Sequence, residues 1–188
     1  MSKTYRLIPL VDLDRKIQLQ VLNIRNEKHI REWMFSSEII SIRDHLTWIE
    51  KLKNNQSQLY LIIINDNTQP LGAINIKKID KNNKNAELGF YKTQNFNEKG
   101  LMTKCLSTII NYSFDILGLE KLYTEVFEGN SKSINIHKKL MFVEEGFLRS
   151  HIIKGDVRIG VHLFGLIKSD WQYNINNTNT FNNMFITI

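Results

Sequence analysis

The residues around Gly100 have the types and spacing to bind an anion. Leu88–Tyr91 has the apolar and aromatic character of a strand, and from Leu101 the apolar residues recur at helical spacing. The first amides of a helix lack an intrahelical partner and carry about half a positive charge, and a glycine beside them lets an anion approach closely. We therefore predict that Asn97–Thr103 binds a phosphate or pyrophosphate, with a simple turn as the alternative.

A second stretch suited to a binding site follows Gly118. Leu122–Phe127 has a strand pattern, and Asn130 is placed to cap the helix that comes next. The chain contains neither GxxxxGK[ST] nor GxGxxG after a strand, which are two common phosphate-binding motifs. The order of the two stretches, rather than any single motif, therefore carries the functional interpretation.

Together the two stretches resemble the GCN5-related N-acetyltransferases (GNAT). That family carries Q/R-x-x-G-x-G/A in its acyl-CoA loop, and the matching residues here are Asn97, Glu98, Lys99, Gly100, Leu101 and Met102. Its later signature reads approximately N-x-x-A-x-x-L-Y-E-K-x-G-F, and the matching residues are Asn130, Ser133, Ile136, His137, Lys138, Lys139, Met141 and Phe142. Met102 replaces a small residue, His137 a tyrosine and Met141 a glycine. The resemblance extends from about Tyr5 to Trp171.

The resemblance implies an α/β (α+β) fold with a mixed, mostly antiparallel central sheet of about seven strands flanked by helices. In that family the fourth and fifth strands, here Ala86–Lys92 and Lys121–Phe127, splay apart, and acetyl-CoA lies in the gap. Gly89 would accommodate a bulge there. The residues that would contact acetyl-CoA are Phe90, Tyr91, Asn97, Glu98, Lys99, Gly100, Leu101, Met102, Thr103, Asn130 and Ser133.

Acetyl transfer from a thioester to an amine needs a base for the amine, a donor for the oxyanion and an acid for the departing thiolate. The resemblance makes Glu87 and Glu125, on the two splayed strands, the candidate bases. His137 stands where many relatives carry tyrosine, which makes it the candidate acid. The alternatives are that each carboxylate faces water or a lysine, and that His137 is a packed or hydrogen-bonded residue.

The N-terminal part selects the acceptor in this family, and here it resembles two branches. One comprises the ribosomal-protein N-terminal acetyltransferases. The other is the nucleotide-sugar N-acetyltransferase of pseudaminic acid synthesis, which acetylates the 4-amino group of UDP-4-amino-4,6-dideoxy-N-acetyl-altrosamine, and residues 33–37 and 40–50 resemble it more closely. That branch implies a small-molecule acceptor, an amino-sugar nucleotide, bound by Arg25, Met34, Phe35, His45, Trp48, Lys78 and Tyr91.

Two other interpretations remain open, one for the N-terminal part and one for the whole chain. Met34, Phe35 and Trp48 could be core residues, with Arg25 in a surface ion pair. The chain could also be a non-catalytic acyl-CoA-binding module on the same fold, because Met102 and His137 depart from the family pattern.

The rest of the chain supplies the elements that position these residues. Ser41 and Asp44 form a capping box, and the helix that follows would turn Ile42, Leu46, Ile49 and Leu52 inward. Leu59–Ile64 is a continuous apolar run, which predicts a strand covered on both faces. Other strands are predicted at Tyr5–Leu10, Leu71–Ile79, Phe142–Ile153 and Val157–Ile167, and other helices before Arg25 and from Leu101 to Leu117.

The composition is that of a soluble globular domain, with 188 residues of which 42% are hydrophobic and 23% charged. We predict one GNAT domain over residues 1–172 and an asparagine-rich tail over residues 173–188. The net charge of +6 is spread along the chain, so we expect no nucleic-acid partner. Without a signal-peptide pattern or an apolar run that could span a bilayer, we expect a cytoplasmic protein with no membrane partner.

The cysteine and histidine residues predict packing rather than a metal centre. Cys105 lies on the apolar face of the helix that follows Gly100, where a buried thiol is expected. The histidines show no metal-ligand spacing, so no metal is expected. A homodimer is compatible with the resemblance.

Overall fold

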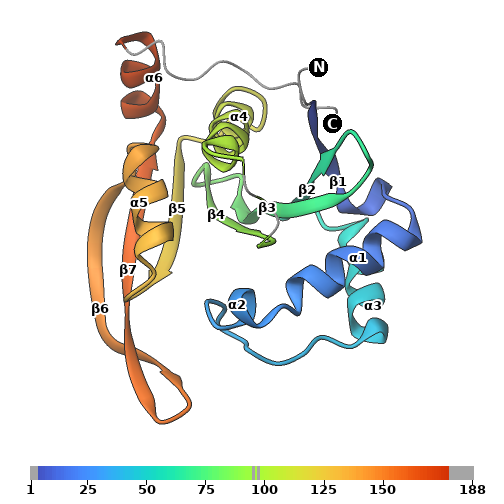
Figure 1. Ribbon diagram of the computed structural model, residues 1–188. Helices are drawn as coiled ribbons and strands as arrows, with labels where there is room; N and C mark the ends of the chain where they lie inside the picture. The colour runs from blue at the N-terminus through green and yellow to red at the C-terminus, as the bar shows by residue number, and fades with distance from the viewer. Residues whose placement is uncertain (1–3, 95, 97, 178–188) are drawn as a thin grey trace. The chain divides into compact units, whose positions relative to one another are not determined.

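The computed structural model describes residues 4–94, 96 and 98–177 (Figure 1). These residues form two compact units, and each unit takes more than one segment of the chain. Among the described residues, the first unit draws on the ranges 4–79 and 89–101, and the second on the ranges 80–88 and 102–177. The chain passes between the units after residues 79, 88 and 101, and the second of these points lies within β4 (Asn85–Lys92), so this strand contributes to both.

The first unit joins β1 (Tyr5–Pro9), β2 (Leu59–Asn65) and β3 (Pro70–Asp80) in antiparallel pairs. Its helices are η1 (Leu10–Asp12), α1 (Arg15–Arg25), α2 (Lys28–Arg31) and α3 (Ile42–Leu52). The residues from Leu61 to Ile64 are all buried, which confirms the strand predicted from the continuous apolar run. One face of β2 and β3 packs against α1 and α3 through a cluster that includes Ile17, Val21, Ile49, Ile62, Ile64 and Ala73.

The start of α3 confirms the predicted capping box and corrects one inward-facing residue. The Ser41 hydroxyl oxygen accepts a hydrogen bond from the Asp44 amide at 3.1 Å, and the hydroxyl donates to the Asp44 carboxylate at 2.7 Å. Ile42, predicted to face inward, is 59% exposed. The cluster packs against the helix through Leu46, Ile49 and Leu52, so its first turn lies beyond the cluster.

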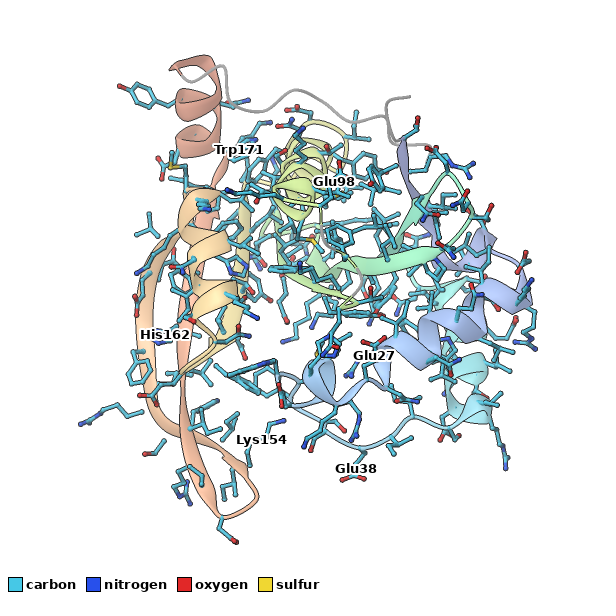
Figure 2. All side chains as sticks on the ribbon, viewed as in Figure 1. Glu27, Glu38, Glu98, Lys154, His162 and Trp171 are labelled. Atoms are coloured by element: carbon cyan, nitrogen blue, oxygen red, sulfur yellow. The ribbon has the colours of Figure 1, made fainter. Side chains whose placement is uncertain are left out.

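The second unit contains the first half of β4 together with β5 (Lys121–Phe127), β6 (Val143–Lys154) and β7 (Val157–Ile167). The hairpin of β6 and β7 confirms the predicted one, and β7 also pairs antiparallel with β5. Its helices are α4 (Leu101–Asp115), α5 (Ser131–Lys139) and α6 (Lys168–Asn177). The ring of Trp171 on α6, which Figure 2 labels, donates from Nε1 to Asn111 Oδ1 at 2.7 Å and thereby links α6 to α4.

The strands follow the order β1-β2-β3-β4-β5-β7-β6 in a seven-stranded sheet. β4 and β5 are parallel, whereas β1–β2, β2–β3, β5–β7 and β6–β7 are antiparallel. This mixed, mostly antiparallel sheet with flanking helices confirms the predicted fold class. The ladder of β4 with β5 joins Asn85, Ala86 and Glu87 to Lys121, Leu122 and Tyr123, and both strands continue beyond it.

The C-terminal end differs from a simple domain-and-tail arrangement. α6 continues to Asn177, past position 172 where the asparagine-rich tail was predicted to begin. Residues 178–188 of that tail lie outside the described residues. Among the helices of the described chain, none combines the length and apolar character needed to cross a membrane.

Candidate active site

The loop before α4 has the backbone geometry of an anion-binding turn. Gly100 has φ +82°, a left-handed conformation that side chains disfavour, and apart from Gly100 and its two chain neighbours no heavy atom of the described residues lies within 4 Å of the position a Cβ would take. α4 begins at the next residue, Leu101. An open backbone at a helix start is suited to binding an anion, so the pyrophosphate-binding role of this loop stays a prediction.

The side chains of the predicted loop point in several directions. Asn97 lies outside the described residues. Glu98 accepts a hydrogen bond from the Tyr5 hydroxyl, and Lys99 is exposed. Met102 is buried on the inner face of α4, which explains in physical terms why a large apolar residue occupies a position where relatives have a small one. Leu101 is buried with it, and Thr103 is half-buried.

Cys105, one turn further along α4, is fully buried. Burial raises the pKa of its thiol to about 12, so the thiol is protonated and unreactive at neutral pH. This result agrees with the packing role predicted for it.

The two candidate bases lie on neighbouring strands of the second unit. Glu87 is 7% exposed and stands opposite Tyr123 in the β4–β5 ladder. Glu125 is half-buried, two residues after Tyr123, and therefore points to the same face of the sheet as Tyr123 and Glu87. The structure thus places both carboxylates on one face.

His137 is a packed residue of α5. Its side chain is 1% exposed, its ring stacks on Phe164 at 5.9 Å and contacts the edge of Phe142 at 5.1 Å between centroids. Nδ1 lies 2.9 Å from the Ser133 carbonyl oxygen, which can only accept, so Nδ1 carries the proton of the neutral ring. Burial lowers the pKa of His137 to about 4, although the hydrogen bond to Ser133 raises it.

This low pKa argues against His137 as the general acid, the role predicted from its position in the sequence. An ordinary histidine pKa near 6.5 would leave a sizeable imidazolium fraction near neutral pH. With a pKa of about 4, only about one ring in a thousand is charged at pH 7. The start of α5 is otherwise as predicted, because Asn130 Oδ1 accepts from the Ser133 amide at 3.2 Å.

Most of the predicted acceptor residues meet in the first unit. Arg25 ends α1, and its Nη1 is buried without a hydrogen-bond partner among the described residues. The hydroxyl groups of Tyr60 and Tyr91 are hydrogen-bonded at 3.1 Å. Burial raises the pKa of both hydroxyls, that of Tyr91 well above its usual range, and the positive charge of Arg25 opposes the rise.

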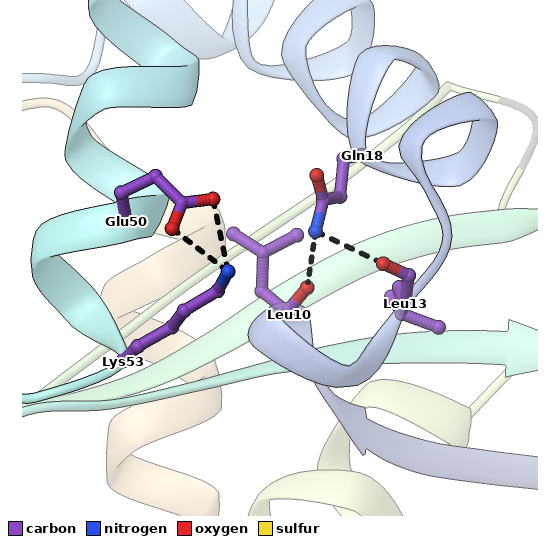
Figure 3. A network of polar contacts seen from close by, with 5 residues as sticks. All are labelled: Leu10, Leu13, Gln18, Glu50 and Lys53. Atoms are coloured by element: carbon purple, nitrogen blue, oxygen red, sulfur yellow. Dashed lines mark hydrogen bonds and ion pairs between the residues drawn. The ribbon is translucent and has the colours of Figure 1, made fainter.

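Trp48 lies beside Tyr60, and His45 lies beside Trp48. Trp48 meets the Tyr60 ring edge-on at 4.9 Å, and His45 lies 5.7 Å from Trp48 between ring centroids. His45 Nε2 is 3.0 Å from the carbonyl oxygen of Gln18, and burial lowers the pKa of His45. Gln18 is itself fixed, because its Nε2 donates to the Leu10 and Leu13 carbonyl oxygens at 3.3 and 2.9 Å (Figure 3). His45 is therefore held as a neutral ring beside Trp48.

Not every predicted acceptor residue belongs to this group. Met34 packs against the apolar cluster that contains Tyr91, with Trp48 and Tyr60. Phe35 is 55% exposed, and Lys78 is exposed with φ 51° on β3, so neither is part of the buried group. Tyr91 was predicted for both the cofactor and the acceptor, and its hydroxyl lies with Tyr60 on the acceptor side; Phe90 alternates to the opposite face of β4.

Sequence reasoning missed three residues of the first unit that carry polar groups into buried positions. Tyr60 pairs with Tyr91, and the side-chain oxygens Asn75 Oδ1 and Thr93 Oγ1 are buried without a hydrogen-bond partner among the described residues. One signal was present in the sequence. Asn75 interrupts the apolar run of Leu71–Ile76, where a polar side chain must have a local reason.

Comparison with known proteins bears on the family of this chain. Residues 6–143 match the model of the Acetyltransferase (GNAT) domain. The chain is 26% identical over 175 residues to the Bacillus subtilis protein named "Putative ribosomal N-acetyltransferase YdaF", covering 90% of this chain and 93% of the relative. It is 29% identical over 118 residues to Acetyltransferase PseH of Campylobacter jejuni, covering 63% of this chain and 71% of the relative.

A solved structure shares the fold. The spermidine N-acetyltransferase of Vibrio cholerae, in complex with CoA and spermine, superposes with a TM-score of 0.81 over 90% of this chain and 98% of that chain, at 20% sequence identity. At this identity the likeness shows the fold alone. Because the GNAT domain model covers most of the chain, the protein belongs to the GNAT acetyltransferases and is an N-acetyltransferase that uses acetyl-CoA as its acetyl donor.

Proposed function

We propose that this enzyme acetylates the amine of a nucleotide-linked amino sugar, namely the 4-amino group of a UDP-linked 4-amino-4,6-dideoxy sugar of the kind used in pseudaminic acid synthesis. The observation that carries the proposal is Arg25, whose Nη1 is buried without a hydrogen-bond partner among the described residues. A buried donor left unpaired costs about 1–3 kcal/mol. An anionic ligand that accepts from Arg25 recovers this free energy, and a diphosphate offers the paired oxygens that suit a guanidinium.

The surroundings of Arg25 fit a ligand with one charged and one apolar part. The Trp48 and Tyr60 rings contact each other, and Met34 packs against the same apolar cluster. A 6-deoxy sugar presents a methyl group and an apolar ring face to such side chains. The proposal therefore assigns the diphosphate to Arg25 and the sugar to Met34 and Trp48.

The positive charge of Arg25 in the predicted acceptor group argues against a polyamine acceptor. Spermidine is a polycation, and the predicted acceptor group contains the half-buried cation Arg25, whose Nη1 is buried. Like charges at short distance repel, the more so where water is excluded. The likeness to a spermidine N-acetyltransferase therefore supports the fold and not the same substrate.

A ribosomal N-terminal acetyltransferase is the second candidate. It is favoured by the relative named for ribosomal N-acetylation, which covers 90% of this chain. A protein N-terminus supplies an amine, and unlike a nucleotide sugar it need not carry an anionic group. The two candidates therefore differ in whether Arg25 is needed for acceptor binding.

The acetyl-CoA-binding part of the proposal rests on the Gly100 loop. Its open, left-handed backbone before α4 would hold the pyrophosphate. When bound, acetyl-CoA supplies the acetyl group as a thioester. Glu87 and Glu125 stay the proposed bases, since both carboxylates lie on one face of the second unit.

A comparison of acceptors tests the proposal. Purified enzyme is assayed for CoA release with the UDP-linked amino sugar, with a ribosomal N-terminal peptide and with spermidine, at fixed acetyl-CoA. We expect the highest kcat/KM with the amino sugar, and acetylation of the peptide or spermidine alone would refute the assignment. Arg25→Ala should raise the KM for the sugar nucleotide by about 10- to 100-fold and leave the KM for acetyl-CoA unchanged. Arg149→Ala, which changes an exposed arginine on β6 of the second unit, is the control.

A further inference from the structure

Asn75 of β3 carries a buried hydrogen-bond acceptor that no described residue uses. Its side chain is 9% exposed, and Oδ1 has no hydrogen-bond partner among the described residues. Buried polar atoms of native proteins are nearly always paired, so an exception calls for an explanation such as a bound ligand. Because Oδ1 is a carbonyl oxygen, the missing partner is a donor.

The position of Asn75 in the sheet tells which face its amide occupies. Asn75 pairs with Tyr60 across β2 and β3, and the next pair along on this face is Ala73 with Ile62. Directly opposed residues of an antiparallel pair share a face. Asn75 therefore lies on the face that bears Tyr60 and Tyr91, whose hydroxyl groups are sensitive to the charge of Arg25.

Gly89 makes room for the Asn75 amide. A Cβ at position 89 would lie 2.8 Å from Asn75 Oδ1, a distance that forces a shift, and 3.3 Å from Nδ2, which is tighter than most contacts of a Cβ. The amide therefore lies across the backbone of β4 at Gly89. A side chain at this position would displace it, which is a close-approach reason for glycine in the middle of a strand.

We propose that Asn75 Oδ1 accepts a hydrogen bond from the amine of the acceptor substrate, and that Gly89 is required because it leaves space for this amide. An amine is the donor group that all acceptors of an N-acetyltransferase share. The proposal rests on the acetyltransferase activity and on the geometry of β3 and β4, and it holds whichever amine is the natural acceptor.

The contact positions the nitrogen without removing its proton. The nitrogen lone pair forms the C–N bond to the acetyl carbon, the C–S bond breaks with its electron pair on sulfur, and the base takes the proton lost from nitrogen. The N–H held by Asn75 remains in the product amide of a primary amine. Because the nitrogen becomes more positive as it attacks, the hydrogen bond from it to Asn75 strengthens in the transition state.

Asn75→Leu tests the contact, because leucine has a similar volume and no acceptor. The acceptor is whichever of the UDP-linked amino sugar, the ribosomal N-terminal peptide and spermidine the parent enzyme acetylates fastest. We expect kcat/KM for that amine to fall by about 10- to 100-fold, with the KM for acetyl-CoA unchanged. The melting temperature should not fall, since the variant removes an unpaired buried polar atom. A normal kcat/KM, or a lower melting temperature with unchanged kinetics, would overturn the proposal.

Two further variants separate positioning from a structural role. Asn75→Asp keeps an oxygen acceptor and should recover activity as pH rises and its carboxyl group ionises, whereas Asn75→Leu should show no such recovery. Gly89→Ala should cause a similar loss through displacement of the amide. The double variant Asn75→Leu with Gly89→Ala should then be no worse than Asn75→Leu alone, and losses that multiply would refute the link between the two residues. The ranking of the three amines by the kcat/KM of the parent enzyme tests the proposed acceptor class, independently of the Asn75 and Gly89 variants.

Discussion

Replacing His137 by phenylalanine should remove part of the acid sensitivity of this protein. The ring is buried, and its pKa is lowered to about 4 from the ordinary 6.5 because burial penalises the charged form. Between these values the unfolded chain binds a proton at this residue and the folded chain does not. The free energy of unfolding is therefore fully retained above about pH 6.5 and falls as pH decreases toward 4.

The size of the effect follows from the two pKa values. Linkage gives a loss of about 2 kcal/mol between pH 7 and pH 5, and of about 3 kcal/mol once both states are protonated. Phenylalanine cannot bind the proton, and its ring can occupy the space between Phe142 and Phe164. His137→Phe should therefore be less sensitive to acid than the parent by about 2 kcal/mol over this interval.

Urea unfolding of the parent and of His137→Phe, at pH 7, 6 and 5, measures the difference directly. Other groups, including His45 with its lowered pKa, titrate in both proteins and cancel in the comparison. His151→Gln, which changes an exposed histidine on β6, serves as the matched control. Parallel pH profiles for the parent and His137→Phe would refute the buried, neutral histidine.

The same variant decides the catalytic role of His137. A group that is the general acid typically contributes about 10²–10⁴-fold to the rate. Because the ring is neutral above about pH 5, we expect His137→Phe to keep kcat within a few-fold of the parent at pH 8. A loss of two or more orders of magnitude in a folded variant would restore His137 as the acid.

Three further outcomes follow from the geometry. Gly100→Val should raise the KM for acetyl-CoA sharply, because a β-branched residue at φ +82° costs about 1–3 kcal/mol and shifts the loop backbone; unchanged kinetics would contradict the cofactor role. Trp48→Ala should raise the acceptor KM more than the acetyl-CoA KM, since Trp48 packs on Tyr60, and a lower melting temperature with unchanged KM values would make Trp48 a core residue. Cys105 should resist alkylation by iodoacetamide at pH 8 until urea unfolds the protein, and rapid labelling of the native protein would argue against its burial and its pKa of about 12.

The sequence by itself determined most of the strands and the starts of two helices, because these depend on neighbours along the chain. The Ser41–Asp44 cap, the Asn130 cap and the buried strand β2 all agree with patterns a few residues long. The turn at Gly100 was also readable, since a left-handed residue before a helix favours glycine. The order of these elements was sufficient to indicate the GNAT fold.

Only the tertiary structure decided which side chains are buried, paired or left without a partner. The helical pattern that turns Leu46 and Ile49 inward assigned Ile42 to the core as well, but the sheet cluster ends before the first turn of α3. The position of His137 in the sequence suggested a general acid. In the folded chain, however, Phe142 and Phe164 pack against its ring and exclude the water that its charged form needs. Residues 25, 60, 75 and 91 come from four separate elements, so no local spacing could bring Arg25, the tyrosine pair and the Asn75 amide to one face. Burial and pairing depend on contacts between distant segments, and those contacts exist only in the folded chain.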